Sequence, residues 1–263
     1  MDLAGVLLAN ALAIIALMSV VWLISVPRRD VSIVDIAWGP GFGMVAWFTL
    51  VVADGADARR LLLAALTSIW GLRLGAYLAW RNLGRGEDRR YAAMRAHRPG
   101  SFWWWSLPFV FGVQAVLMWI VSLPIQAAGG QRLPEGLVAL DVLGIVLWCV
   151  GYFFESVGDA QLARFKADPA NRGKVMDSGL WRYTRHPNYF GDFMVWWGIY
   201  AIALATGDAW WTIVGPITMS VLLIKGTGAA LLEKTIGERR PGYDQYVQRT
   251  SRFIPLPPKR ASA

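Results

Sequence analysis

Long apolar stretches alternate along this chain with short charged segments and with segments rich in glycine and proline. A helix of about 20 apolar residues is long enough to cross the roughly 30 Å hydrocarbon core of a bilayer. Such stretches predict transmembrane helices at residues 3–26, 31–52, 61–80, 101–123, 137–157, 188–206 and 209–232. We therefore expect an all-α integral membrane protein with about seven transmembrane helices.

The composition agrees with this class. Of the 263 residues, 56% are hydrophobic and 15 are tryptophan, whereas soluble domains are about 45–50% apolar. The net charge of +8 does not indicate nucleic-acid binding, because the basic residues lie between the predicted spans. The single cysteine, Cys149, excludes an internal disulfide and a multi-cysteine metal site, so we expect no metal. We expect Cys149 to be a small buried hydrophobe.

The distribution of basic residues predicts the orientation of the chain. Of the 26 Lys and Arg residues, 21 fall on one side of the predicted spans, and the other side has only Arg59, Arg60 and Arg132 in its loops. Basic loops are retained in the cytosol. We therefore expect the N-terminus outside and the C-terminus in the cytosol. Residues 124–134 are expected to form a loop on the outer side, and the basic, aromatic tail 233–255 is expected to form a short docked helix in the cytosol.

Asp35 is the first candidate for chemistry, because it lies inside the second predicted span. An acid within a span costs about 2.5–3.5 kcal/mol and usually faces a pocket or a partner. Alternatively, Asp35 lies at the interface and caps its helix. The Gly and Pro residues of 38–43 that follow are expected to break or bend this helix.

The third predicted span carries Arg73 and Tyr77 on one helix face. Arg73 either meets a carboxylate or a ligand phosphate, or extends to the membrane interface. Arg81 begins the charged segment 81–91, which is either a solvated loop or drapes over a phosphate.

Glu155 and Asp159 share a helix face at the end of the fifth predicted span. The helix dipole disfavours acids in the last turns of a helix. We therefore expect these carboxylates to meet arginine partners or the ribose or amide groups of a ligand.

The densest polar and aromatic segment is 179–192, Gly-Leu-Trp-Arg-Tyr-Thr-Arg-His-Pro-Asn-Tyr-Phe-Gly-Asp. Pro187 is suited to the first turn of a helix, and the free N–H groups of a helix start attract anions. Arg182, Arg185 and His186 directly precede this start, and Asn188 and Asp192 share its face. The pattern predicts the rim of a pocket for a charged, phosphorylated ligand.

Segment 179–192, together with 159–169 and 243–255, resembles the C-terminal half of membrane steroid 5-alpha-reductases and sterol C14/C7 reductases. Residues 35–39 and 86–91 are similar to the bacterial branch of this family. The resemblance implies a membrane fold of seven to ten helices and NADPH-dependent reduction of a C=C bond in a lipid or steroid-like substrate. It also implies the bacterial inner membrane, with the cofactor site facing the cytosol.

The family motif Asn-x-x-Gly-Asp/Glu is matched by Asn188, Gly191 and Asp192. From the residues and the resemblance together, we expect NADPH to contact the following positions: Arg73, Arg81, Asp159, Arg164, Lys166, Arg182, Arg185, His186, Asn188, Tyr189, Asp192, Tyr246 and Arg252. The candidate catalytic residues are Asp35, Tyr77 and Glu155, with Asp35 handling the proton or polarising a carbonyl. This chain departs from steroid reductases, because Trp70 replaces the family tyrosine and a Gln-Glu pair is missing from the second span.

A second family shares part of the motif. Isoprenylcysteine carboxyl methyltransferases resemble this chain at Arg185-His-Pro-x-Tyr189-x-Gly191 and at the tail, which implies S-adenosylmethionine as cofactor. Asp192 and the Asp-Pro pair at 168–169 favour the reductase. A non-enzymatic lipid-binding membrane protein is the third alternative. Under the reductase hypothesis, we expect 1–136 to line the lipid-substrate cavity and 137–263 to bind the cofactor.

Overall fold

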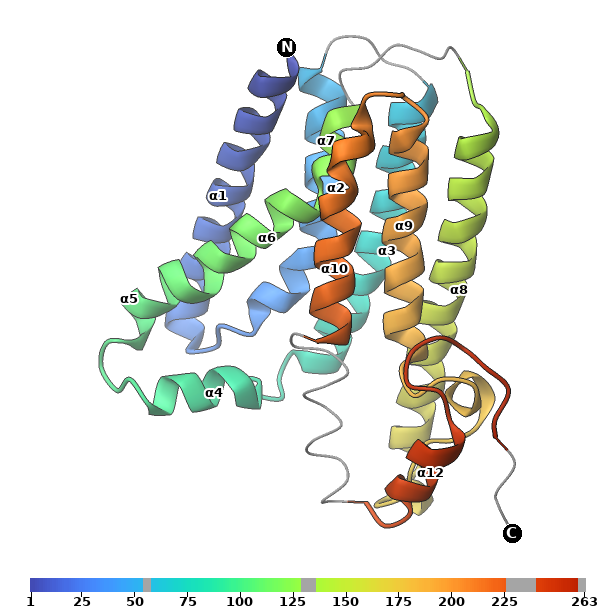
Figure 1. The fold of residues 1–263 in the computed structure, drawn as a ribbon. Coiled ribbons are helices and arrows are strands. Elements are labelled where there is room, and N and C mark those ends of the chain that lie inside the picture. The colour runs from blue at the N-terminus through green and yellow to red at the C-terminus, as the bar shows by residue number, and fades with distance from the viewer. Residues whose placement is uncertain (54–57, 129–135, 226–239, 260–263) are drawn as a thin grey trace. The chain divides into compact units, whose positions relative to one another are not determined.

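The computed structural model describes residues 1–53, 58–128, 136–225 and 240–259, and helices dominate them (Figure 1). These ranges contain no strand longer than an isolated bridge, so the predicted all-α class is confirmed. Five of the described helical segments are long and apolar enough to span a membrane, which supports an integral membrane protein. They are α1 (Leu3–Arg28), α2 (Ile33–Val52), α3 (Ala58–Asn82), the segment Phe102–Val121 and α8 (Ala139–Ala167).

Two further helices coincide with the last predicted spans. Helix α9 (Pro187–Leu204) begins at the predicted proline, but its first turns carry polar residues that lower its hydropathy. The short turn η4 (Ala209–Ile213) leads into α10 (Val214–Ile224). The rest of that predicted span, from 226 on, lies outside the described residues. The count of seven spans and the orientation of the termini stay predictions.

The chain forms two compact units, which are described separately. The first comprises Met1–Asp141 with Ile199–Gly215, and the second comprises Val142–Gly198 with Pro216–Ala263. In the first unit, α2 packs closely along α3. The closest approach is at Gly39 and Gly71, where a Cβ on either residue would overlap the backbone of the other.

Residues 38–43 do not break the second helix, because α2 is continuous from Ile33 to Val52, and a bend at these residues stays a prediction. Its small residues serve close packing instead. A Cβ on Gly75 of α3 would lie 2.8 Å from the ring of Pro40. Such small-residue contacts let helix backbones approach each other.

The fourth predicted span consists of α5 (Phe102–Ser106), a π-helical turn η1 (Leu107–Gly112) and α6 (Val113–Val121). The prediction of a loop at 124–134 is wrong for the first part of that range, because α7 (Leu123–Ala128) is helical and buried. Gln126 donates hydrogen bonds to the Trp119 carbonyl and the Ser122 hydroxyl at 3.0 and 2.8 Å, which helps to hold this helix in the interior. Residues 129–135 of the predicted loop lie outside the described ranges.

Arg59 and Arg60, predicted to be loop residues, are helical and buried, because α3 begins at Ala58 rather than near Leu61. The Arg59 guanidinium makes two hydrogen bonds to the Asp141 carboxylate, at 2.8 and 2.9 Å. Both side chains are almost fully enclosed. This pair joins the starts of two long helices, α3 and α8.

In the second unit, α8 and α9 pack through glycines. Gly144, Gly151 and Gly158 recur at seven-residue intervals on α8. A Cβ on Gly151 would lie 2.5 Å from the carbonyl oxygen of Gly191, and one on Gly198 would lie 2.6 Å from that of Gly144. The two helices therefore run with their backbones in contact (Figure 1).

Helix α8 continues to Ala167, well past the predicted end of the span. Glu155 and Asp159 therefore lie inside the helix, and the expected dipole penalty of a last turn does not apply to them. Cys149, predicted to be buried, is exposed on this helix. A side chain on the outer face of a spanning helix meets lipid, which suits a weakly polar thiol.

Candidate functional site

The turn η3 (Gly179–Arg182) begins the densest motif of the sequence and is anchored to α8. The Leu180 backbone N–H donates to Gln161 Oε1 at 3.0 Å, and Trp181 Nε1 donates to the Gly158 carbonyl at 3.0 Å. Gly179 has φ +60°, and a Cβ there would lie 2.5 Å from the Gln161 amide. The sequence therefore needs glycine at this position, and the turn follows the helix surface closely.

The C-terminal tail docks on this turn and on the loop that follows it. Its described part consists of the helix α12 (Tyr243–Arg249) and an extended segment, and residues 233–239 of the predicted docked helix lie outside the described residues. The Tyr246 hydroxyl donates to the Trp181 carbonyl oxygen at 2.5 Å. The Arg185 N–H donates to the Ser251 carbonyl at 2.9 Å, within a short parallel bridge. Burial, followed by the nearby Tyr243, raises the pKa of Tyr246. The tail thus completes the hydrogen bonding of the motif.

The start of α9 packs against α8. Asn188 Nδ2 donates to Asp159 Oδ1 at 3.2 Å. The His186 ring stacks on the Tyr189 ring, with centroids 5.4 Å apart and planes 6° from parallel. Asp159 and His186 are each 4% exposed. Four of the predicted cofactor residues therefore lie at one helix junction.

Two clefts of the second unit meet at Ser178 and Gly179. The first has a volume of ≈ 390 Å³, and its lining includes Asp177, Arg182 and Arg249. The second has a volume of ≈ 460 Å³, and its lining includes the residues Gln161, Arg164, Phe165, Asn171 and Met176. Each volume is in the range of small-molecule sites, about 300–1,000 Å³.

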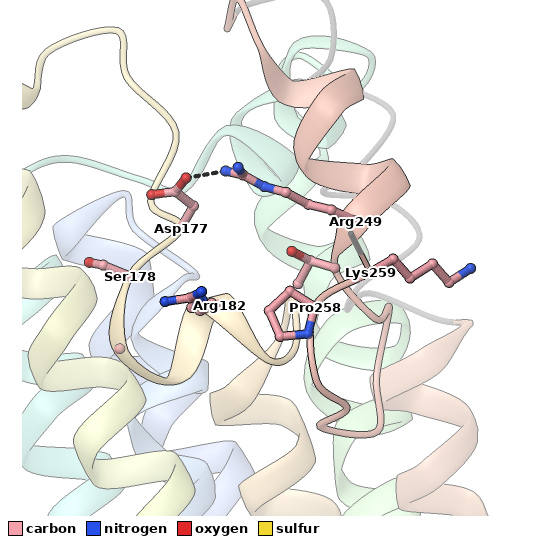
Figure 2. Close-up of a pocket in the computed structure, with 8 residues that line it drawn as sticks. Asp177, Ser178, Arg182, Arg249, Pro258 and Lys259 are labelled. Carbon is pink, nitrogen blue, oxygen red and sulfur yellow. Dashed lines mark hydrogen bonds and ion pairs between the residues drawn. The ribbon is translucent and has the colours of Figure 1, made fainter. Parts of the chain in front are cut away.

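The two clefts differ in chemistry. In the first, Arg249 of α12 forms an ion pair with Asp177 (Figure 2). Arg182 lies on the same side of this cleft as Asp177 and Ser178, whereas the Lys259 amine points away from them. The second cleft combines an aromatic ring and a thioether with two side-chain amides, and its charged residues are Arg164 and Asp168. The first therefore suits an anion, and the second suits a flat polar ring.

In the first unit, Asp35 lies in the first turn of α2 and binds the helix α4 (Arg89–Ala96). Its carboxylate accepts from Arg90 Nη2 at 2.8 Å and from the Tyr91 hydroxyl at 2.9 Å. Gln114 Nε2 donates to the same hydroxyl at 3.1 Å. Burial, followed by the charge of Asp35, raises the pKa of Tyr91. The segment 81–91 is therefore only partly a loop, and Asp35 joins a span to a surface helix.

Arg73, Tyr77 and Arg81 form a column on one face of α3. The guanidinium groups of Arg73 and Arg81 lie 5.6 and 5.7 Å from the centroid of the Tyr77 ring. The predicted sharing of a face by Arg73 and Tyr77 is thus seen as a cation–π contact.

A protein-family model described as "Protein of unknown function (DUF1295)" matches residues 21–250. The chain belongs to this family. DUF1295 is part of the steroid 5-alpha-reductase-like superfamily, in agreement with the resemblance seen in the sequence.

Three other proteins are similar in sequence to this chain. An uncharacterised protein of Schizosaccharomyces pombe is 26% identical over 90% of this chain and 76% of its own length. The Delta(14)-sterol reductase erg24A of Aspergillus fumigatus is 30% identical over 43% of this chain and 23% of its own. The "Probable O-methyltransferase ustE" of Ustilaginoidea virens is 36% identical over 30% of this chain and 26% of its own. No solved structure matches the chain significantly.

The predicted site residues of this DUF1295 chain fall into both units. Asp35, Arg73, Tyr77 and Arg81 belong to the first. The second contains the remaining predicted residues, Glu155, Asp159, Arg164, Lys166, Arg182, Arg185, His186, Asn188, Tyr189, Asp192, Tyr246 and Arg252. Among these, Glu155 is buried on α8, whereas Lys166 and Arg252 are exposed.

Sequence reasoning missed Asp177 and Arg249, which pair across 72 positions of the chain. Both are ordinary surface residue types, and no spacing rule connects them. It also missed Tyr91 and Arg90, although Asp35 required a partner. Both residues lie in the charged segment 81–91, which was the nearest source of a cationic partner for Asp35. That segment was therefore the signal that could have found them.

Proposed function

We propose that this chain is an NADPH-dependent membrane reductase of a C=C bond in a lipid or steroid-like substrate. The observation that carries the proposal is the arrangement of the Asn188-x-x-Gly191-Asp192 motif. Asn188 is bonded to Asp159, and Gly191 is in backbone contact with α8. The likeness to a Delta(14)-sterol reductase supports the same activity.

The chain offers groups that fit a nucleotide cofactor. Arginines line both clefts, and the Asp159–Asn188 pair presents carboxylate and amide atoms at the start of α9. We assign cofactor contacts to this region and to the predicted residues beside it. When bound, NADPH supplies the hydride for one carbon of the C=C bond and leaves as NADP⁺.

The protein supplies the proton for the other carbon. The proposed proton-handling residues are Asp35, Tyr77 and Glu155. Tyr91 joins them as a proposed proton donor, because its hydroxyl donates a hydrogen bond to Asp35 at 2.9 Å. Arg90 holds Asp35 in place and stabilises its negative charge.

A methyltransferase is the second candidate, because a short stretch of the chain is 36% identical to a protein named as an O-methyltransferase. Such an enzyme takes S-adenosylmethionine, which has no phosphate. The two functions therefore differ in the cofactor that stabilises the protein.

The test is thermal unfolding of the full-length protein in detergent with NADPH, NADH or S-adenosylmethionine. A ligand at 100 times its Kd adds about 2.7 kcal/mol to the stability of the native state. We expect stabilisation by NADPH, and we expect Asp192→Ala to abolish it. The matched control is Asp208→Ala, at an exposed aspartate in the turn that follows α9.

Stabilisation by S-adenosylmethionine alone would replace the reductase with the methyltransferase. Stabilisation by none of the three would favour a lipid-binding protein without this chemistry. NADPH binding that survives in the Asp192 variant would support the reductase but remove Asp192 from the cofactor site.

A further inference from the structure

The cleft beside η3 presents two arginines that come from distant parts of the chain. Arg182 lies in the turn itself, and Arg249 is in the last turn of α12. The tail is fixed there by the Tyr246–Trp181 hydrogen bond and by the Leu256 N–H, which donates to the Tyr183 carbonyl at 3.0 Å. Arg249 is therefore held over the cleft by folded structure.

A carboxylate already occupies one side of this cleft. Asp177 pairs with Arg249, and both side chains are about half exposed, at 44% and 47%. An exposed ion pair of this kind contributes about 0–1 kcal/mol, so it exchanges readily for a stronger anion. Arg182 and Arg249 together carry two positive charges against the single charge of Asp177.

A phosphomonoester is the anion that matches this arrangement. It carries a charge of about −1.5 to −2 near neutral pH and three acceptor oxygens. Guanidinium groups bind such oxygens through two parallel hydrogen bonds. Ser178, whose hydroxyl donates a weak hydrogen bond to Met176 Sδ at 3.9 Å, lies between the two clefts and lines both.

The adjoining cleft suits the group to which the phosphate would be attached. Phe165 and Met176 provide apolar surface, and Gln161 and Asn171 provide amides. A purine ring needs this combination of apolar faces and polar edge contacts. We propose that the Arg182–Arg249 cleft binds the phosphomonoester group of an adenosine 2′-phosphate. The purine of this ligand occupies the adjoining cleft. Asp177 pairs with Arg249 when the phosphate is absent.

This inference rests on the proposed function, because NADPH and NADH differ only in that phosphate. It assigns the preference between them to Arg182 and Arg249. It also makes Asp177 a competitor of the ligand. Removing a competing carboxylate tightens binding, whereas removing a structural contact weakens it, so this variant separates the two roles.

The experiment measures Kd by calorimetry on the full-length protein in detergent, with NADPH, NADH and adenosine 2′,5′-bisphosphate as probes. We expect Arg182→Gln and Arg249→Gln each to weaken NADPH binding about tenfold or more while NADH binding stays within about twofold. Asp177→Asn is expected to tighten NADPH binding severalfold. The control is Arg172→Gln, which removes an exposed arginine outside both clefts and is expected to change neither affinity.

Two further arms test whether the anion is a phosphomonoester and identify its source. The preference for NADPH over NADH should fall between pH 7.5 and pH 5.5, because a phosphomonoester gains a proton near pH 6. Nanodiscs with phosphatidic acid should not displace adenosine 2′,5′-bisphosphate. Displacement that depends on Arg182 would support a phosphomonoester site but give it to a lipid headgroup, which overturns the nucleotide assignment.

The outcomes separate the two proposals. NADPH binding whose preference over NADH survives both arginine substitutions overturns this inference and leaves the reductase standing. Arginine-dependent binding of phosphatidic acid without NADPH binding overturns the reductase and keeps the phosphomonoester cleft. Binding of none of the phosphate probes overturns both.

Discussion

The hydroxyl of Tyr246 donates a 2.5 Å hydrogen bond to the carbonyl oxygen of Trp181, 65 positions earlier in the chain. Both residues are buried. This contact holds the tail helix α12 against η3, the turn at the start of segment 179–192. The Tyr246 phenol can donate this hydrogen bond only while it keeps its proton.

Alkaline pH should therefore loosen the tail. Burial raises the pKa of Tyr246 above its ordinary value of about 10, so the folded state binds this proton more tightly than the unfolded state. The stabilisation is complete below pH ~10 and is lost as the pH rises through the higher pKa of the folded state. Thermal midpoints of wild type should fall more steeply above pH ~10 than those of Tyr246→Phe. Parallel curves for the two proteins would contradict this account.

Gly191→Ala should destabilise the second unit. The added Cβ would overlap backbone atoms of Gly151 and Glu155, which cannot turn aside as a flexible side chain does. We expect a loss of about 1–3 kcal/mol, measured as a lower thermal midpoint in detergent. Gly43→Ala is the control, because its Cβ would meet Ser68 at 3.6 Å, an ordinary contact. Equal midpoints for the two variants would show that α8 and α9 are not in backbone contact.

Asp141→Ala should be among the most damaging single substitutions in the first unit. It leaves the buried Arg59 guanidinium without its carboxylate, and breaking a buried pair in this way costs about 3–5 kcal/mol. Urea or thermal unfolding measures the loss. The double variant Arg59→Met, Asp141→Leu should recover most of it, because it removes both charges. A double variant as unstable as the single one would mean that the charges themselves are needed.

Arg90→Gln should detach α4 from the start of α2. It removes hydrogen bonds to Asp35 and Asp88, at 2.8 and 2.9 Å. Bonds to charged groups contribute about 1.5–3 kcal/mol, and the partial exposure of this pair places the loss at the lower end. Hydrogen exchange should become faster at the amides of 89–96. Arg89→Gln, at an exposed neighbour, should leave exchange unchanged; an equal effect of both substitutions would refute a specific role for Arg90.

The sequence predicts well that the helices of high hydropathy exist, because a helix that crosses lipid needs a long apolar stretch. Their ends are less predictable. Helix α8 continues beyond the apolar stretch on charged residues, and α7 begins beside Pro124, in a stretch predicted as a loop. The same rule that correctly placed Pro187 in a first helical turn applied to Pro124 as well.

The long-range side-chain pairings of the fold and of the candidate site could not be predicted. Asp177–Arg249, Arg59–Asp141 and Asp35–Arg90 join residues 72, 82 and 55 positions apart. Local patterns carry no information on such partners. The glycine repeat of α8 is different, because Gly144, Gly151 and Gly158 are visible in the sequence and seven-residue spacing already indicates a helix seam.

The docking of the tail sets an order of assembly. Chains are made from the N-terminus onward, and their parts fold as they become available. Residues 181–185 form hydrogen bonds with residues between Tyr246 and Leu256 of the tail. These residues leave the ribosome after the five described helical segments that are long and apolar enough to span a membrane. These segments can therefore enter the bilayer while the motif still lacks its hydrogen-bonding partners, and the candidate cofactor site matures after them.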